Sequence, residues 1–492
     1  GLSATVGNPA AILAWLQGTS DRDAVVVDPP KKPSRRQLLI VHEPDQTQIA
    51  IAAAQVAQGS KSLLFCQSRA TTEAVAETMR RAGTTVFVHH SAVSKEERLL
   101  AEQEFHHGSN ACIVCTSTLE LGIDVGDLDK VLQANAPETV SSFLQRMGRT
   151  GRREGQAANT TFFCETVDSV LQAIALIELA KAGWVEDVPV SQRCWPVLIH
   201  QLLAMSLAAN GIPVEEAWAH LSQVPDFRGI AKEEFDRLIR WMTDDGSLLV
   251  AGGRLILGPQ AARRCGRRNF MELYAVFSSP QSYHVETANK QVIGTLTQDF
   301  VDGLVDGVSC FLLGGRPRAV FHGLHKDRLV GGQPAPRWRQ PTWGGFVPQF
   351  LGFDLCQKIL AIVTGPDDYP YLTPPAAELL AEERHRLRGL VEPVVGGIVG
   401  SHANEVVWHT FAGGRVNSPI RSALAALEPH WTITPDNFAV RARDSGITEA
   451  NFRSVIRNLA APEFWQDAAV WQQIRTALPG YRLSKFQPLM TP

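Results

Sequence analysis

Residues 145–155 read QRMGRTGRREG, and this stretch does most to decide the fold class. It holds four arginines and three glycines in eleven positions, which makes it a poor helix former throughout. Arginine binds phosphate in a bidentate fork and stays charged, while glycine lets the backbone come close to a ligand. We therefore expect guanidinium groups held for a polyphosphate; the alternative is a solvated basic turn.

The composition sets the broad class of the protein. The 492 residues are 45% apolar and 20% charged, as in globular proteins, and the length suggests about three domains. The net charge of −3 means that any nucleic-acid binding depends on local basic patches. The eight scattered cysteines suit a reducing cytoplasm, so we expect a cytoplasmic protein. No apolar run is long enough to cross a bilayer, and we expect no membrane partner.

Strand and helix signals alternate between residues 60 and 165. Helical patterns at 70–83 and 94–105 separate apolar runs, and we expect strands at 62–66, 85–89, 111–116, 130–135 and 159–165. Such alternation is typical of a parallel sheet covered by helices on both faces. Ligands collect beyond the carboxyl ends of such strands, so the loops after residues 66, 89 and 116 are the candidate site.

The pattern changes after residue 191. Three short helical patterns precede SLLVAGGRLILG at 247–258, in which Gly252-Gly253 indicates a tight hairpin. Three helices and a hairpin predict a winged-helix domain, which binds either nucleic acid or protein. From residue 259 onward the sequence is rich in strands and glycine turns, with helices interspersed, which predicts a β-rich α+β domain.

We expect no metal site. Cys112 and Cys115 have the spacing of a metal pair, but they lie in an expected strand where positions three apart point to opposite faces. His322 and His325, in FHGLH, have no cysteine or carboxylate at metal-ligand spacing.

Two stretches together resemble motifs V and VI of superfamily 2 helicases: TSTLELGIDVGDLD at 116–129 and QRMGRTGR at 145–152. The resemblance implies a second RecA-like domain that completes an ATP site shared with a first one. It makes Arg149 and Arg152 arginine fingers, places Gln145 at the nucleotide, and puts Gly122 and Asp124 in the same cleft. Such fingers are worth roughly 10³–10⁵ in the rate of phosphoryl transfer.

Two further segments resemble the parts of these helicases that touch the nucleic-acid backbone. LLFCQSR at 63–69 is similar to motif IV, and VHHSAVSKEER at 88–98 to the block that follows it. Contacts of this kind position a strand without reading its sequence. A single Ser or His at a strand end is more often a cap. The expected phosphate contacts are Gln67, Ser68, Arg69, His89, Ser91, Thr116 and Ser117.

The first residues resemble motif III, which couples ATP hydrolysis to strand movement, with Ser3 and Thr5 as the matching hydroxyls. The phosphate-binding G-x-x-x-x-G-K-[ST] sequence is absent, and so is a DEAD- or DEAH-type box. ATP and Mg²⁺ need the cradle and the carboxylate of a first RecA-like domain. We therefore expect the C-terminal portion of a helicase, which needs that domain as a partner and does not hydrolyse ATP alone.

The order of segments resembles the core of the Lhr (large helicase-related) family. The resemblance rests on FMELYAVFSSPQSYHV (270–285), QVIGTLTQDFV (291–301), CFLLGGRPRAVF (310–321), PAPRWRQPTWGG (334–345) and WHTFAGGRVNSPIRSAL (408–424). It predicts the end of a first RecA-like domain at 1–20, a second at 21–190, a winged helix at 191–258 and a β-rich domain at 259–492. Pro317-Arg318 stands where the family usually has an aromatic residue after the arginine.

Membership of this family implies an ATP-driven translocase that moves 3′-to-5′ on single-stranded DNA. It also implies unwinding of DNA duplexes or RNA–DNA hybrids, in DNA repair. Two other functions stay open: a nucleic-acid-binding or scaffold module that never hydrolyses ATP, and an RNA-directed helicase, since backbone contacts do not distinguish the two sugars in sequence.

A basic and aromatic tract in the β-rich domain makes an independent case for binding a single strand. Between residues 313 and 345, six cations face one acid, and two tryptophans are interleaved. The family resemblance favours Trp338, between Arg337 and Arg339, as the residue that stacks on the strand; the alternative is a partly buried core tryptophan. Trp343 is assigned to the core. RRCGRR at 263–268 is either a second binding patch or a solvated helix end.

Overall fold

The computed structural model describes residues 5–28, 35–108, 110–120, 128–151, 157–265, 282–301, 310–324, 329–334, 350–391, 397–401 and 404–459, with 461 and 463. These residues form two compact units. The first unit contains the described residues of 1–30 and 187–280, and the second those of 31–186 and 281–478.

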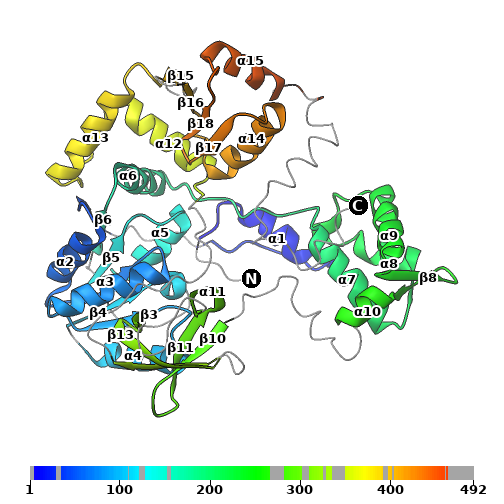
Figure 1. Cartoon of the computed structure of the whole chain (residues 1–492), viewed down its shortest axis with the longest axis horizontal. Coiled ribbons are helices and arrows are strands. Elements are labelled where there is room, and N and C mark those ends of the chain that lie inside the picture. The colour runs from blue at the N-terminus through cyan, green and yellow to red at the C-terminus, as the bar shows by residue number, and fades with distance from the viewer. Residues whose placement is uncertain are drawn as a thin grey trace. The chain divides into compact units, whose positions relative to one another are not determined.

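The second unit is built on a six-stranded parallel sheet in the order β1-β6-β5-β2-β4-β3. The strands are β1 Arg36–His42, β2 Lys61–Phe65, β3 Val86–His89, β4 Ala111–Cys115, β5 Lys130–Ala134 and β6 Ala158–Cys164. The parallel sheet expected for a RecA-like domain is confirmed. Figure 1 labels β3, β4, β5 and β6 of this sheet. Strand β1, at the edge beside β6, was not among the expected strands.

Helices cover both faces of this sheet because its strands are apolar on both sides. On one face, α2 (Gln46–Ala57) and α3 (Arg69–Arg81) pack in a core that includes Leu64 and Cys112. On the other, α4 (Lys95–His107) packs with Leu63 and Cys115, while α5 (Val140–Met147) and α6 (Val167–Lys181) pack on β1 and β6. Cys112 and Cys115 thus lie on opposite faces, and burial raises the pKa of the Cys112 thiol to about 12.

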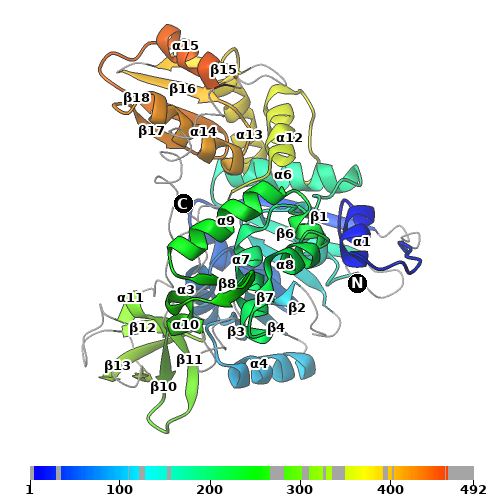
Figure 2. The same ribbon diagram turned by 90° about the vertical axis from the view of Figure 1, so that its right-hand side faces the viewer.

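A five-stranded sheet lies beside α3 and β3 in the same unit. Its order is β11-β10-β14-β13-β12, with β10 Ser282–Glu286, β11 Val292–Thr297, β12 Cys310–Leu313, β13 Arg316–Leu324 and β14 Leu329–Pro334. The short helix α11 (Gln298–Val301) follows β11. Gly314 and Gly315, both at positive φ, form the turn between β12 and β13. Figure 2 shows this sheet next to α4 and β3.

A third module of the second unit packs on α6. It contains α12 (Phe353–Thr364), α13 (Pro374–Leu387), α14 (Gly414–Leu427) and α15 (Glu449–Leu459). Its antiparallel sheet runs β15-β16-β18-β17, with β15 Gly397–Ser401, β16 Glu405–His409, β17 Thr432–Pro435 and β18 Ala439–Arg443. The segment 259–492, predicted as one β-rich domain, thus holds two sheets separated by α12 and α13.

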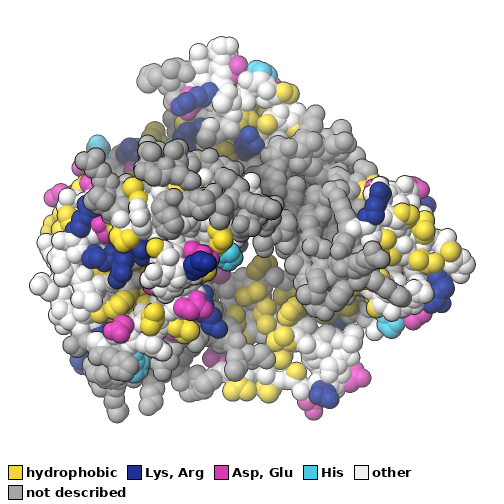
Figure 3. Space-filling view, turned by 60° about the horizontal axis from the view of Figure 1, so that its bottom comes forward, with side chains coloured by type: hydrophobic (Ala, Val, Ile, Leu, Met, Phe, Trp, Pro, Cys, Tyr) yellow, Lys and Arg dark blue, Asp and Glu magenta, His cyan; other side chains and the backbone are white. Residues whose placement is uncertain are grey.

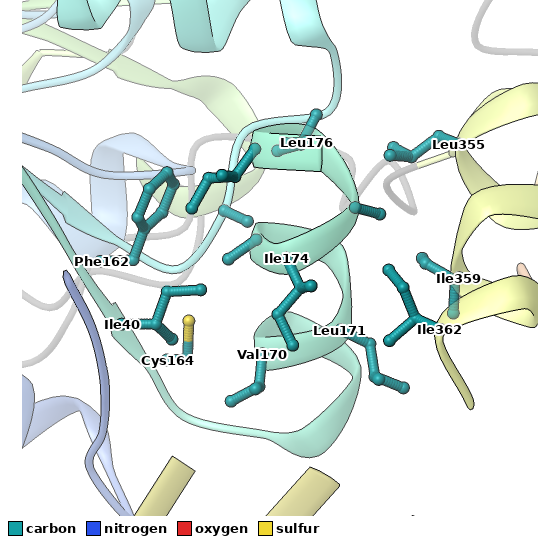
Figure 4. Close-up of a cluster of buried hydrophobic side chains, with 14 of the residues drawn as sticks. Ile40, Phe162, Cys164, Val170, Leu171, Ile174, Leu176, Leu355, Ile359 and Ile362 are labelled. Atoms are coloured by element: carbon teal, nitrogen blue, oxygen red, sulfur yellow. The ribbon is translucent and has the colours of Figure 1, made fainter. Parts of the chain in front are cut away.

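The contact between this third module and the RecA-like domain is an apolar core. Val170, Leu171 and Ile174 of α6 lie between the parallel sheet and the Leu355 and Ile359 side chains of α12 (Figure 4). The edge strand β1 is also covered: Ile40 N donates to Tyr371 O at 2.8 Å, and Thr373 N donates to Ile40 O at 3.0 Å. The edge of β1 is thereby closed to further strand pairing.

The first unit has its own core. Helices α7 (Trp195–Ala208), α8 (Val214–Leu221) and α9 (Lys232–Asp244) pack with a sheet ordered β7-β9-β8. The strands are β7 Ile212–Pro213, β8 Leu248–Ala251 and β9 Arg254–Leu257, and α10 spans Pro259–Cys265. The three helices and the hairpin lie where the sequence predicts them. Gly252 and Gly253 both have positive φ, as its tight turn requires.

An N-terminal helix joins this unit. Helix α1 (Pro9–Gln17), in the segment predicted to end a first RecA-like domain, clusters with residues 187–265. Trp15 Nε1 donates to Asp226 Oδ2 at 2.9 Å, and the Arg228 guanidinium donates to Gly18 O at 3.0 Å. In the described part of the chain, every helix is too short or too polar to span a bilayer.

Candidate nucleotide and nucleic-acid site

The loops chosen from the sequence meet at one edge of the parallel sheet. Cys66 N donates to Cys115 O at 2.7 Å, and Thr116 N donates to His89 O at 3.3 Å, so the carboxyl ends of β2, β4 and β3 are adjacent. Gln67, Ser68, Ser91 and Ser117 are exposed there. The structure therefore gathers the described residues of the three loops on one surface.

The first loop begins helix α3. Ser68 is the N-cap, and its hydroxyl accepts a hydrogen bond from Thr71 N at 3.0 Å. Gln67 Nε2 donates to Ala136 O at 2.7 Å, which ties this loop to the end of β5. Arg69, half-buried, is the first residue of the helix. The amino end of this 13-residue helix faces the loop surface, where its dipole favours an anion.

His89 does not present its side chain to the surface. The residue is only 1% exposed, and its ring lies 2.8 Å from Thr118 Oγ1 and 2.9 Å from Glu102 Oε1. Burial lowers the pKa of the imidazole, with Glu102 opposing this shift. Thr116 N and Thr118 Oγ1 both donate to His89 O. His89 thus orients the turn that carries Thr116, half-buried, and Ser117.

The described part of the arginine-rich stretch is packed rather than solvated. Arg146 is 4% exposed, pairs with Glu120 at 2.6 Å, donates to Gln133 Oε1 at 3.1 Å and lies over the Phe65 ring. The Glu120 carboxylate also accepts from Ser142 Oγ at 3.1 Å. The sequence analysis missed this pair, since no local periodicity signals that a charged residue after TSTL is buried.

Arg149 is held by the same acidic residue through its backbone. The Arg149 guanidinium donates to Glu120 O, while Gln145 Nε2, one turn earlier, donates to Ser141 Oγ at 3.1 Å. Gly151 has φ +67°, and a Cβ there would lie 2.7 Å from Ala158 N. Only glycine suits both requirements. These contacts fix the start of GRTGR against the sheet and argue against a solvated turn.

Several predicted site residues lie outside the residues that the structure describes. They are Ser3, Gly122, Asp124, Arg152, Arg337, Trp338 and Arg339. Thr5 is described and lies in the first unit, shortly before α1.

A buried carboxylate links the loop after β3 to the five-stranded sheet. Glu73 and His90 are both fully buried, with His90 Nε2 2.8 Å from Glu73 Oε1. Glu73 also accepts from Gly314 N at 2.7 Å and from Gly315 N. The sequence analysis missed Glu73 because its partners lie about 240 residues further along the chain.

The same loop pairs with β11. Thr295 N donates to Ala92 O at 2.7 Å, and Ser94 N donates to Ile293 O at 3.0 Å. A Cβ on Gly294 would lie 2.3 Å from Ala92 O, so glycine permits this close approach. Ser91, the predicted phosphate contact, thus lies on a loop that is bonded to Glu73 of α3 and to strand β11.

Comparison with known proteins shows what the chain is similar to. The helicase conserved C-terminal domain matches residues 45–154, which hold β2 to β5 and all of the arginine-rich stretch except its last residue. The ATP-dependent helicase Lhr-Core protein 2 of Thermococcus barophilus is 23% identical over 411 residues, 76% of this chain and 46% of that protein. These similarities support the predicted resemblance to the C-terminal portion of Lhr-family superfamily 2 helicases.

Other Lhr proteins show the same resemblance. The Lhr helicase/uracil glycosylase of Escherichia coli is 34% identical over 148 residues, which are 30% of this chain and 10% of that protein. The chain therefore spans less than half the length of these two curated relatives. The structure of Mycobacterium smegmatis helicase Lhr bound to ssDNA and AMP-PNP shares the fold, with a TM-score of 0.65 and 20% identity over 92% of this chain and 60% of that one.

Proposed function

We propose that this chain is the C-terminal part of an ATP-dependent helicase that moves 3′-to-5′ on single-stranded DNA. It would unwind DNA duplexes or RNA–DNA hybrids and act in DNA repair. The observation that carries the proposal is the packed turn at Gly148–Gly151: the Arg149 guanidinium donates to Glu120 O, and Gly151 lies against Ala158 at the start of β6. A scaffold has no need of an arginine held in this way.

In the proposed mechanism, two RecA-like domains close over ATP. Arg149 and Arg152 stabilise the charge that develops on the γ-phosphoryl group, and Gln145, Gly122 and Asp124 line the same cleft. Among the described residues no group of three His, Cys, Asp or Glu side chains could hold a metal ion. The first RecA-like domain would therefore supply the carboxylate for Mg²⁺ as well as the phosphate cradle.

The test uses a longer chain that includes the first RecA-like domain. Arg149→Ala and Arg152→Ala are each expected to lower ATP turnover by roughly 10³-fold or more while single-strand affinity stays within about threefold. Arg81→Ala is the matched control, since Arg81 is an exposed cation on α3 with a side chain 62% exposed. Turnover retained in both finger variants would overturn the finger assignment.

Closure would move the strand along the loop surface. Backbone contacts at Gln67, Ser68, Arg69, Ser91, Thr116 and Ser117 would hold its phosphates, with the peptide groups of His89 contributing more than its buried ring. Figure 3 shows acidic and basic side chains interspersed on one face of the described surface. Strand binding would depend on local contacts, including the predicted tract of Arg337, Trp338 and Arg339.

Fluorescence anisotropy with matched single-stranded DNA, RNA and duplex at several salt concentrations tests this binding. We expect single-strand binding with a steep salt slope, and a loss of about 1–3 kcal/mol in Trp338→Ala. Equal affinity for RNA would favour an RNA-directed helicase. No binding at low salt would favour the second candidate function, a scaffold module without ATP hydrolysis.

The charge of the first unit favours a protein partner for that unit. We propose that it is a winged-helix domain. Its third helix, α9, carries four acids (Glu233, Glu234, Asp236 and Asp244) against three cations (Lys232, Arg237 and Arg240). A helix with this balance is poorly suited to lie against phosphates.

A further inference from the structure

A pocket opens at the carboxyl edge of the parallel sheet, on the side away from β3. Its volume is about 240 Å³. Asn135 and Glu165 directly follow β5 and β6, and Gln67 is the second residue after β2, so three neighbouring strands point their carboxyl ends at the pocket. This is the edge at which parallel α/β sheets bind ligands. The volume lies just below the range of drug-sized sites, and it suits one small flat group.

The wall of the pocket comes from two modules of the second unit. Thr166, Asp168 and Ser169 at the start of α6 form one side, and Asn437 and Phe438 of the third module form the other. The Thr166 hydroxyl caps α6 by accepting from Ser169 N at 3.2 Å. The Ser169 hydroxyl is buried and has no oxygen or nitrogen hydrogen-bond partner among the described residues; it lies beside the Cys164 thiol.

The charge of the lining residues disfavours a phosphate, because Glu165 and Asp168 both line the pocket and no Lys or Arg is among its described lining residues. Burial, then Asp436 and Glu383, raise the pKa of the Asp168 carboxyl, while Arg386 and Arg441 oppose this shift. A carboxylate accepts hydrogen bonds, so it is best matched by a ligand that donates N–H groups, as the exocyclic amino group of cytosine or adenine does.

Phe438 supplies an aromatic surface. It is half-buried and packs on one side against Phe411, with ring centroids 5.6 Å apart. Aromatic side chains are the usual stacking partners of unpaired bases. An aromatic ring, hydroxyls, amides and carboxylates around a small volume are the components of a site for a nucleobase rather than for a sugar phosphate.

We propose that this pocket binds one unpaired base of the single strand, turned out of the strand beside Gln67, stacked on Phe438 and hydrogen-bonded to Asp168. The proposal rests on the proposed function, since Gln67 is both a predicted backbone contact and part of the pocket wall. The strand's phosphates would stay on the loop surface, and amino-bearing bases would bind better than thymine.

The experiment compares three 12-nucleotide probes on the full chain by fluorescence anisotropy: oligo-dC, oligo-dT and a chain of abasic tetrahydrofuran residues. For the unsubstituted protein we expect dC to bind more tightly than dT and both to bind more tightly than the abasic chain. Stacking worth about 1–3 kcal/mol per base corresponds to roughly 5- to 150-fold in affinity. Phe438→Leu should lower the ratio of dC to abasic affinity by about tenfold.

Asp168→Asn is the second variant, and it should reduce the preference for dC over dT while leaving the abasic affinity unchanged or slightly higher. Binding of the abasic chain reports that each variant is folded. The matched control is Gln55→Ala, in a second pocket of about 240 Å³ between α2 and α3, away from the loop surface. A loss of equal size on all three probes, or no loss in either variant, would overturn the base site.

A cross-linking measurement separates this proposal from the proposed function. Irradiation of the protein with an oligonucleotide containing 5-iodocytosine, followed by peptide mass spectrometry, should label Phe438 or its neighbours. Labels confined to peptides remote from residues 165–172 and 437–438 would also overturn the base site. Failure of the unsubstituted chain to bind any probe at low salt would instead remove the proposed strand binding itself.

Discussion

Two modules attach to the RecA-like domain in opposite ways. The five-stranded sheet attaches through polar groups: Glu73 accepts from Gly314 and Gly315, the Arg80 guanidinium donates to Gly315 O, and Thr295 N donates to Ala92 O. The module of α12 and α13 attaches through a continuous apolar core on α6. Both attachments lie within the second unit.

The difference separates the attachment that contributes most of the free energy from the one that fixes the positions of the groups. Apolar burial is non-directional and scales with area, so the α6–α12 contact should carry most of the free energy. Hydrogen bonds to a buried carboxylate are directional and so require defined positions, and losing one partner leaves buried groups unsatisfied. The polar attachment therefore fixes the loop of Ser91, whereas the apolar one keeps the modules together.

The largest expected effect is in the apolar attachment. Ile359→Ala removes a fully buried side chain of α12 and should lower the free energy of unfolding by about 2–5 kcal/mol. Phe353→Ala, on the same helix but 52% exposed, should change it by less than about 0.5 kcal/mol. Urea unfolding followed by circular dichroism measures both. Equal effects would show that α12 is not held by its buried face.

The second-largest effect is expected from a substitution that removes the polar attachment. Glu73→Ala leaves the N–H groups of Gly314 and Gly315 without their acceptor and should cost about 1–3 kcal/mol locally. Hydrogen exchange should rise in residues 310–324 and stay unchanged in α12. Thr78→Ala is the control, since the Thr78 hydroxyl bonds only within α3, to Ala74 O. Faster exchange across both modules would contradict a separate attachment.

Two neighbouring glycines in the same attachment should differ in their response to alanine. Gly314 and Gly315 both have φ near +65°, so alanine at either costs about 1–2 kcal/mol in strain. A Cβ on Gly315 would also lie 2.9 Å from Val88 Cγ2, whereas nothing lies within 4 Å of one on Gly314. Gly315→Ala should therefore lower the free energy of opening of the hairpin, as hydrogen exchange measures it, by about 1 kcal/mol more than Gly314→Ala does. Matching effects would mean that the turn does not dock.

The smallest effect is a pH dependence at the rim of the apolar attachment. His409 is buried and stacks on Phe411; burial, then Arg386 and Arg441, lower the pKa of its imidazole against the opposing charges of Asp436 and Glu383. Its neutral form is therefore favoured in the folded protein. The contribution of His409 to the free energy of unfolding should be fully present above the ordinary histidine pKa of ~6.5. It should decline as the pH falls from there towards the lowered pKa, by at most about 1.4 kcal/mol per pH unit.

Urea unfolding between about pH 7 and pH 5 measures this decline, and His409→Gln should flatten it. An unchanged slope in His409→Gln would assign the pH dependence to other groups.

Local chemistry made several features of the chain predictable. Gly83 has φ +86° just after α3, Ser94 caps α4 by accepting from Glu97 N, and Gly252-Gly253 form the turn between β8 and β9. Each depends on residues within a few positions of one another, so the sequence pattern carries the information. The loops at the carboxyl edge were also predictable, because strand order in a parallel sheet fixes where the loops meet.

The long-range contacts were not predictable in this way. Strand β1 is explained by its place at the sheet edge beside residues 371–373, and Glu73 by a hairpin about 240 residues away. His89 looked like a surface contact in the sequence, yet its ring is buried against Glu102. Neither periodicity nor spacing reports which charged side chain finds a distant partner.

The sequence by itself determined the parallel-sheet class, the resemblance to Lhr helicases and the arginine-rich turn, since these depend on short patterns whose physics is local. Tertiary structure alone decided that Arg146 is buried against the Glu120 carboxylate while Arg149 donates to the Glu120 carbonyl, and that the two modules attach by different forces. The reason is that burial and pairing depend on which surfaces meet, and surfaces that meet here come from residues hundreds of positions apart.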